Sequence, residues 1–195
     1  IRNSLRVFLS EDTSHMIDNI IKGTGAFSDF PSMGFNPSDP ATRDGIAKSF
    51  DKTIYDDGNV TIYHARDVLK GLQYMAKYMS HCESASKGAS EIYAVFLRGV
   101  PYYTVEVSSN GEMTQFKGYK NRAVGSEKPH GSSPKISRGL LVDDLRNFSR
   151  VFNEIKKHRG GSLRLGDTII NTDLKLLNQE QRGIVNQVQP QITLQ

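Results

Sequence analysis

Four polar side chains between residues 102 and 117 have the types and spacing that could orient a polar ligand. A carboxylate, an amide and an ammonium at fixed positions on one sheet face could do so, and the carboxylate could act as a general acid or base. The alternative is a solvated sheet face, which half-exposed hairpins commonly present. Both interpretations stay open for these residues, which are Thr104, Glu106, Gln115 and Lys117.

A β-hairpin is predicted to position these four side chains. Polar and apolar residues alternate over 102–107 and again over 112–117, and Asn110-Gly111 between them is typical of a tight turn. If Asn110 and Gly111 are the central residues of a type I′ turn, counting outward fixes every cross-strand pair. The predicted pairs are Ser109 with Glu112, Val107 with Thr114, Glu106 with Gln115, Val105 with Phe116 and Thr104 with Lys117.

The segment 117–138, which follows the hairpin, is cationic and rich in Gly, Ser and Pro. It contains six lysines and arginines but one acid, Glu127. A loop of this composition suits anions, and phosphate contacts are the expected use of such cations. The candidate nucleic-acid-binding residues are Lys117, Lys120, Asn121, Arg122, Lys128, Lys135 and Arg138.

His81 and Cys82 stand side by side at the end of a predicted helix. A cysteine beside a histidine could be an activated nucleophile, whereas the alternative is a cysteine that is simply buried. The candidate catalytic residues are Glu106, Gln115, His81 and Cys82.

Two amphipathic helices and two strands form the rest of the expected core. Apolar residues at spacings of three and four predict helices over 66–81 and 140–158. The run 60–65 predicts a strand, and the continuous apolar run 92–97 predicts a strand covered on both faces. The fold class is therefore α+β, with a small antiparallel sheet, made of a strand and the hairpin, packed against the two helices.

Shorter patterns suggest the domain organisation. Asp39 or Thr42 can cap a short helix that ends near Phe50, and 163–170 can form one more strand. Further expected elements are a helix at 14–22, a loop at 26–40 held by aromatic residues, and a short helix at 174–177. The predicted divisions are an N-terminal helix and aromatic loop segment (1–59), an α+β core domain (60–170) and a polar tail (171–195).

Composition narrows the class of protein. The 195 residues are 37% hydrophobic, with a net charge of +4 and a pI of about 9.1, so a nucleic-acid partner is permitted without being required. The single cysteine, Cys82, excludes an internal disulfide framework and points to a reducing compartment. No apolar run approaches the ~20 residues that span a bilayer, and no charged-then-apolar leader opens the chain. No membrane partner is expected, and the predicted location is the cytoplasm.

A series of short pieces within 60–122 resembles the core of one known family. The pieces are a helix leading into His81-Cys82, the Lys87-Gly88 turn, the strand 92–98, the strand Tyr103-Thr104-Val105-Glu106, and Gln115, Gly118, Asn121 and Arg122 after the hairpin. They are similar to the PcfJ-like family, which phages and conjugative elements encode. The resemblance covers about a third of the chain. It implies a phage or mobile-element origin without a defined biochemical activity.

Two enzyme classes are alternatives to this family. The strand Ile62-Tyr63-His64-Ala65 is similar to the strand that opens ADP-ribosyltransferase sites, where the histidine holds the nicotinamide ribose and Glu106 would be the distal acid. For a nuclease, the acid pairs Asp56-Asp57 and Asp143-Asp144 are adjacent, and turn and helix-capping roles explain them. Neither a metal nor a cofactor is predicted.

Three functions remain as expectations. The leading one is an accessory protein of a phage or mobile element that binds nucleic acid through the basic loop. The second is an enzyme that acts on a nucleotide or a phosphorylated substrate, either ADP-ribosyltransferase-like or a nuclease. The third is a structural or host-interaction protein of a virion. The phage or mobile-element origin also implies a protein partner in an assembly of that kind and a location in the host cytoplasm or a virion.

Overall fold

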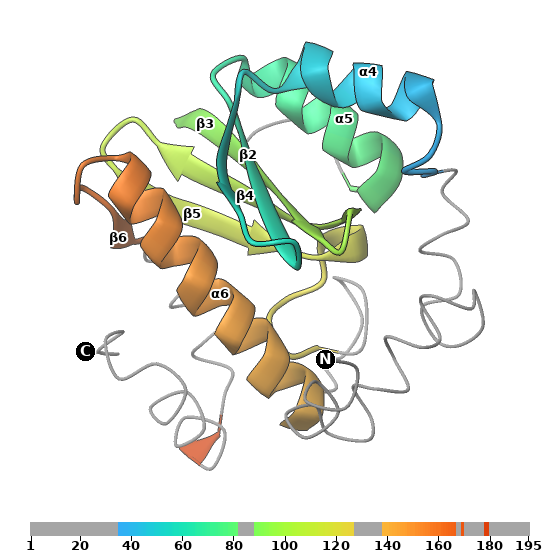
Figure 1. Ribbon diagram of the computed structural model, residues 1–195. Helices are drawn as coiled ribbons and strands as arrows, with labels where there is room; N and C mark the ends of the chain where they lie inside the picture. Colours follow the sequence, from blue (N-terminus) through green and yellow to red (C-terminus); the bar gives the residue numbers. More distant parts are fainter. Residues whose placement is uncertain (1–34, 82–87, 127–137, 167–168, 170–177, 180–195) are drawn as a thin grey trace.

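The computed structural model describes residues 35–81, 88–126, 138–166, 169, 178 and 179 of the chain. Within them, one sheet of six strands runs in the order β1-β2-β3-β4-β5-β6, antiparallel except for the parallel pair β5–β6 (Figure 1). The predicted α+β class is confirmed, and the sheet is larger than expected and mixed. The elements are α4 (Pro40–Ser49), β1 (Lys52–Asp56), β2 (Val60–Ala65), α5 (Val68–Met79), β3 (Ala89–Leu97), β4 (Val100–Ser108), β5 (Glu112–Lys117), the 3-10 turn η1 (Tyr119–Asn121), α6 (Arg138–His158) and β6 (Arg164–Leu165).

Helices lie on both faces of the sheet. α5 lies on one face with α4 beside it, and α6 crosses the other face (Figure 1). Strand β3 carries alternate side chains into both layers, since successive residues of a strand point to opposite sides. Ile92 and Phe96 join the α5 core, while Tyr93 and Val95 join the α6 core, and all four are at most 1% exposed. The strand predicted to be covered on both faces is therefore confirmed.

The apolar stripe of α6 forms one of these cores. Gly160 and Gly161, both with positive φ, follow its last turn, where their N–H groups bond the carbonyls of Lys157 and Lys156. This end agrees with the predicted helix 140–158. The buried residues of the stripe are Leu145, Phe148, Val151, Phe152 and Ile155.

The other layer is built from α5 and α4. Asp67 caps α5 by accepting a hydrogen bond from the Lys70 N–H at 3.1 Å. Asp39 caps α4, which confirms one of the two predicted caps for the short helix before Phe50. Phe50 then packs edge-on against Tyr74 of α5, with ring centroids 5.3 Å apart. α4 therefore belongs to the same core as α5.

The hairpin register agrees with the prediction over the stretch that carries the polar residues. Val105 pairs with Phe116, Glu106 pairs with Gln115, and Thr104 pairs with Lys117. The polar face of the hairpin is therefore assembled as the alternation predicted.

The turn of the hairpin differs from the prediction. Val107 pairs with Met113, not Thr114, because the ladder shifts by one residue between Glu106 and Val107. Gly111 alone has positive φ, whereas a type I′ turn needs it at Asn110 as well. The loop therefore has three residues. The bulge at Thr114 compensates for the one-residue shift, so the predicted pairs are restored from Glu106 and Gln115 onward, away from the turn.

The predicted boundary at residue 59 does not separate two structural units. It falls in the turn between β1 and β2, where β1 pairs antiparallel with β2, for example Tyr55 with Ile62. The core domain therefore begins upstream of residue 60 and includes α4. At the other edge, the strand expected within 163–170 is present as β6, which pairs with Glu112 and Met113 of β5. The expected elements at 14–22 and 174–177, residues 26–34 of the expected loop at 26–40 and most of the tail lie outside the described residues.

Candidate functional site

The polar residues of β4 are buried. Thr104 and Glu106 are each 4% exposed and lie on the α5 side of the sheet, because Glu106 is paired with Ile92, a member of the α5 core. Their partners on β5, Gln115 and Lys117, are half-buried. At Thr104 and Glu106 this face is therefore covered, which differs from the solvated face that was the alternative interpretation.

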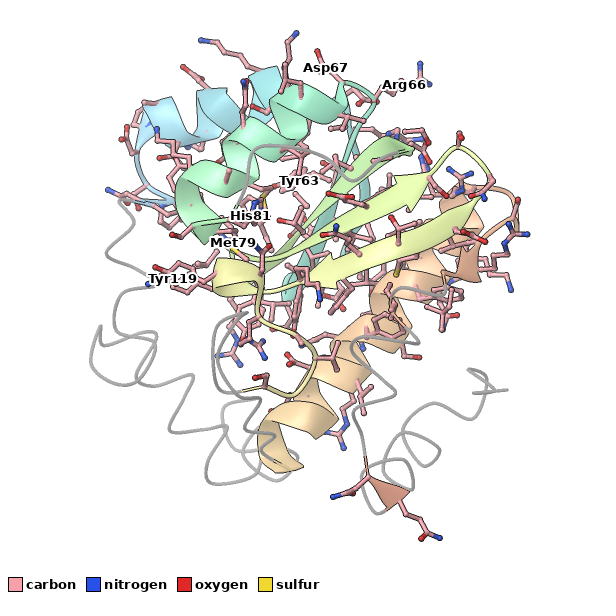
Figure 2. The ribbon with its side chains drawn as sticks, turned by 180° about the vertical axis from the view of Figure 1, so that it is seen from behind. Tyr63, Arg66, Asp67, Met79, His81 and Tyr119 are labelled. Carbon is pink, nitrogen blue, oxygen red and sulfur yellow. The ribbon has the colours of Figure 1, made fainter. Side chains whose placement is uncertain are left out.

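His81 comes to the same face from the end of α5. The helix stops at Ser80, whose left-handed backbone (φ 51°) redirects the chain over the sheet. His81 Nε2 then lies 2.9 Å from the Thr104 hydroxyl oxygen, and Figure 2 places it beside Met79 and near Tyr119. Thr104 and Glu106 are two residues apart on one strand, roughly 7 Å. Three of the four candidate catalytic residues, His81, Glu106 and Gln115, therefore share one region, and Cys82 lies outside the described residues.

The basic segment after β5 is only partly described. Lys117 is half-buried opposite Thr104, and Lys120 is exposed, with its ammonium 5.3 Å from the centre of the Tyr119 ring. Asn121, like Lys120, has a left-handed backbone. Lys128 and Lys135 lie outside the described residues, and Arg138 is the first residue of α6.

Arg122 does not lie on the surface, and this corrects its assignment to the nucleic-acid-binding set. It is 4% exposed, and its guanidinium donates to both carboxylate oxygens of Asp144, at 2.6 and 3.0 Å. Burial opposes the charge on Arg122, but the Asp144 carboxylate outweighs burial and raises the Arg122 pKa. Arg122 is therefore committed to a buried ion pair and cannot reach a phosphate.

Asp144 is the centre of this buried polar cluster. Besides Arg122, it accepts hydrogen bonds from the Tyr103 hydroxyl at 2.5 Å and the Gly125 N–H at 2.7 Å. Arg122 donates further to the Ser126 carbonyl at 3.0 Å. The cluster ties α6 to β4 and to the chain after η1. Asp144 was expected to cap a helix, so its role is a correction to the sequence analysis.

A groove of about 910 Å³ lies along the outer side of α6, away from its apolar stripe. Two of its cations have acid neighbours: Arg150 pairs with Asp57 at 2.5 Å and Lys157 with Glu154 at 2.8 Å. This face of α6 was not predicted from the sequence, although its polar residues 146, 150, 153 and 157 recur at the spacing of three and four that places side chains on one side of a helix. The groove is lined by four cations and one acid, with polar and glycine residues between them: Arg146, Arg150, Lys156, Lys157, Glu154, Ser149, Asn153, Gly160 and Gly161.

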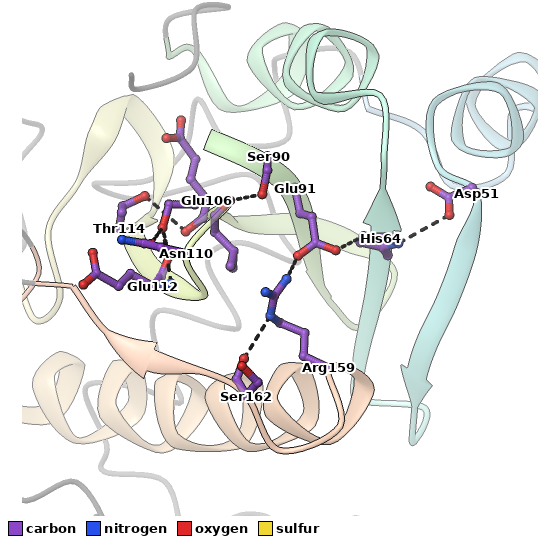
Figure 3. Close-up of polar contacts among 12 residues, drawn as sticks. Asp51, His64, Ser90, Glu91, Glu106, Asn110, Glu112, Thr114, Arg159 and Ser162 are labelled. Atoms are coloured by element: carbon purple, nitrogen blue, oxygen red, sulfur yellow. Dashed lines mark hydrogen bonds and ion pairs between the residues drawn. The ribbon is translucent and has the colours of Figure 1, made fainter. Parts of the chain in front are cut away.

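His64 links the β1 edge of the sheet to the end of α6 on the opposite side from Glu106. Its Nδ1 lies 3.3 Å from Asp51 and its Nε2 lies 3.0 Å from Glu91, which in turn accepts a hydrogen bond from Arg159 (Figure 3). Burial lowers the His64 pKa, and the Asp51 carboxylate opposes that effect. Since His64 and Glu106 lie on opposite faces, they do not form the site that an ADP-ribosyltransferase-like arrangement needs.

Two kinds of feature are absent from the described part of the chain. None of its helices is long and apolar enough to cross a membrane. Among the same residues, no group of three or more His, Cys, Asp or Glu side chains could hold a metal ion. The candidate sites there are therefore built from hydrogen-bonding and charged side chains.

Comparisons with protein-family models, with curated proteins and with solved structures found no match for this chain. The resemblance to the PcfJ-like family is untested by them and stays a prediction. Function is therefore argued from the residues of this chain.

Proposed function

We propose that this domain binds nucleic acid through the outer side of α6, as an accessory protein of the phage or mobile-element kind that the PcfJ-like resemblance implies. The observation that carries the proposal is the α6 groove, whose lining holds four cations and one carboxylate, with Asp57 as a second acid beside Arg150. Lys117 and Lys120 are a separate source of positive charge, since Lys117 lies on the α5 side of the sheet opposite Thr104. Because Arg122 is buried, it takes no part in binding.

The dimensions of the groove suit a phosphate backbone. Arg146 and Lys157 are eleven residues apart on α6, about 16 Å along a helix that rises 1.5 Å per residue. Phosphates of one strand of duplex DNA recur about every 3.4 Å along the axis, so this length faces roughly five of them. Ser149 and Asn153, which lie between the cations, can donate hydrogen bonds to phosphate oxygens.

The lining also predicts how selective the binding is. None of the groove residues is aromatic, so no ring is present to stack on a base. Phosphate contacts fix position and carry little sequence information. We therefore expect binding that depends on charge and salt and varies little with base sequence.

Replacing Arg146, Lys156 and Lys157 together by Gln should weaken binding of a labelled oligonucleotide at least about tenfold at low salt, because counterion release from phosphates is lost. Fluorescence anisotropy with single- and double-stranded oligonucleotides of different sequence measures this effect. The matched control replaces Lys48, Lys70 and Lys77 by Gln, which removes the same charge from exposed positions on α4 and α5.

Equal losses in the groove and control variants would reduce the effect to net charge and remove the α6 groove as the interface. A third variant, with Lys117 and Lys120 replaced by Gln, measures the contribution of the segment after β5. We expect it to weaken binding less than the groove variant, because these are two of the several cations in that segment.

A second candidate function, an enzyme acting on a nucleotide or phosphorylated substrate, is favoured by the polar cluster at β4 and β5. Glu106 is a buried carboxylate next to Gln115, and His81 is held on the same face by Thr104. A carboxylate and an imidazole on a rigid sheet could share proton-transfer roles. This candidate and nucleic-acid binding use different faces of the sheet.

Glu106→Gln nearly preserves shape and removes the capacity to transfer a proton. If the enzyme interpretation holds, the variant should fold and bind nucleic acid normally while cleavage of a labelled oligonucleotide or hydrolysis of a nucleoside triphosphate falls about 100-fold or more. Glu112→Gln, at a half-buried position of β5, is the control. Turnover that survives in Glu106→Gln, or its absence from the unaltered protein, would leave binding as the function.

A further inference from the structure

A second cavity, of about 440 Å³, lies where α4 turns into β1. It is distinct from the α6 groove, with which it shares no lining residue. Its volume is within the range of about 300–1,000 Å³ that is usual for small-molecule sites. The lining residues come from α4, the turn after it, β1 and β2: Arg43, Ile46, Ala47, Phe50, Asp51, Lys52, Thr53 and Tyr63.

One wall of this cavity is aromatic and apolar. The Phe50 and Tyr63 rings stack, with centroids 5.6 Å apart and planes 26° from parallel. Phe50 is buried at 7% exposure, whereas Tyr63 is half-buried. Ile46 continues the apolar surface on α4. A planar ring could lie against this wall, with Tyr63 as its most accessible contact.

The rim of the cavity carries unneutralised positive charge. Arg43 is exposed and forms no salt bridge among the described residues, whereas Lys52 is paired with His64 and therefore lies on the opposite face from Tyr63. The one carboxylate in the lining, Asp51, already accepts a hydrogen bond from the Arg66 N–H at 2.8 Å and faces His64 Nδ1 at 3.3 Å. An anion beside Arg43 would therefore meet one available cation and a carboxylate whose charge is engaged elsewhere.

Asp51 is held in place from behind the cavity. His64, which it faces, is 3% exposed and contacts Glu91 through its other ring nitrogen (Figure 3). A carboxylate keeps further lone pairs when it accepts one or two hydrogen bonds, so Asp51 can still accept an N–H from a ligand. The cavity thus offers a ring surface, one cation and one fixed acceptor.

We propose that this cavity binds a nucleoside phosphate, with the ring against Tyr63, the phosphate at Arg43, and a ring N–H directed at Asp51. The three features match the three chemical parts of such a ligand. The proposal does not depend on the α6 groove. The ligand is either a free nucleotide or the terminal nucleotide of a strand, since both present the same groups.

Isothermal titration with GMP, guanosine and inorganic phosphate tests whether ring and phosphate are recognised together. We expect saturable binding of GMP, and binding at least about tenfold weaker for guanosine and for phosphate, because each lacks one set of contacts. A 5′-phosphorylated trinucleotide distinguishes the two sources: tighter binding than GMP indicates a strand end, and weaker binding indicates a free nucleotide. Phosphate binding as tight as GMP, or no saturation by GMP at millimolar concentration, would overturn the proposal.

Substitutions locate the binding in this cavity. Arg43→Gln, at an exposed position, should weaken GMP binding about five- to tenfold through loss of a charge-assisted contact. Lys48→Gln, on the same helix but outside the lining, should leave it unchanged. GMP affinity unaffected by Arg43→Gln would reject the site, whatever the α6 variants show in oligonucleotide binding.

Discussion

Arg122→Met is expected to lose about 3–5 kcal/mol of unfolding free energy, because it leaves the Asp144 carboxylate buried without its cation. Asp144 is 1% exposed and receives two guanidinium hydrogen bonds from Arg122. Tyr103 and Gly125 also donate to it, but neither carries a positive charge. Urea denaturation followed by circular dichroism measures the loss.

Arg150→Met provides the matched control for that prediction. Arg150 also pairs with an aspartate, Asp57, but its side chain is 48% exposed. An exposed pair of this kind contributes at most about 1 kcal/mol. Equal unfolding free energies of the two variants would show that the buried cluster does not stabilise the contact between α6 and β4 as its hydrogen bonds indicate.

Phe116→Ala is expected to cost about 3–5 kcal/mol through lost burial and the cavity left behind. Phe116 is 1% exposed, with its ring 4.4 Å from that of Tyr103 and 4.9 Å from that of Phe148. It therefore joins β4, β5 and α6 in one core. Phe116→Leu, which keeps most of the volume, should cost less than half as much. A loss below 1 kcal/mol in Phe116→Ala would contradict the hairpin register as well as the packing, since the register places Phe116 opposite Val105.

The hairpin shows what alternation can predict. Side chains of a strand alternate with a period of two, so the pattern around Val105 and Phe116 assigned the correct faces. The loop could not be determined in the same way, because Asn-Gly fits either a two-residue type I′ turn or a three-residue loop with glycine in the left-handed region. The structure adopts the second, and the bulge at Thr114 hides the difference from the rest of the ladder.

Asp144 could have been identified from the sequence. On α6 it lies one residue before Leu145 and four before Phe148, within the apolar stripe. A carboxylate there must be buried and therefore needs a partner. The identity of that partner, Arg122, depends on a contact between residues 22 positions apart, which local patterns do not specify.

Strand β1 was missed for a different reason. Its five residues lie at the sheet edge, and only Ile54 and Tyr55 are half-buried, so the segment has almost no hydrophobic pattern. Strand β2 was predicted because most of its residues are apolar, as is usual for a strand whose residues are mostly buried. Without β1, the boundary was placed in the turn after it, and the cavity beside Asp51 could not be foreseen.

The candidate site residues differ in the same way: those placed by a local pattern were predicted correctly, and those whose position depends on distant contacts were not. Glu106 and Gln115 were brought together because they belong to one hairpin, and its register followed from the sequence. Arg122 was assigned to the surface on charge alone, and charge does not reveal burial. The α6 groove was overlooked because the helix 140–158 was predicted from its apolar residues alone. Helical spacing from Arg146 onward would have indicated it.

The salt dependence of oligonucleotide binding tests the central claim most directly. Affinity of the full chain for a duplex should fall as salt rises, with log K against log salt giving a slope of about −3, as expected for three to four phosphate contacts. The variant lacking the charges of Arg146, Lys156 and Lys157 should reduce that slope by about 2 or more. Nucleic-acid binding through α6 would be contradicted by a slope near zero or by an unchanged slope in this variant. It would also be contradicted by the absence of binding at about 50 mM salt.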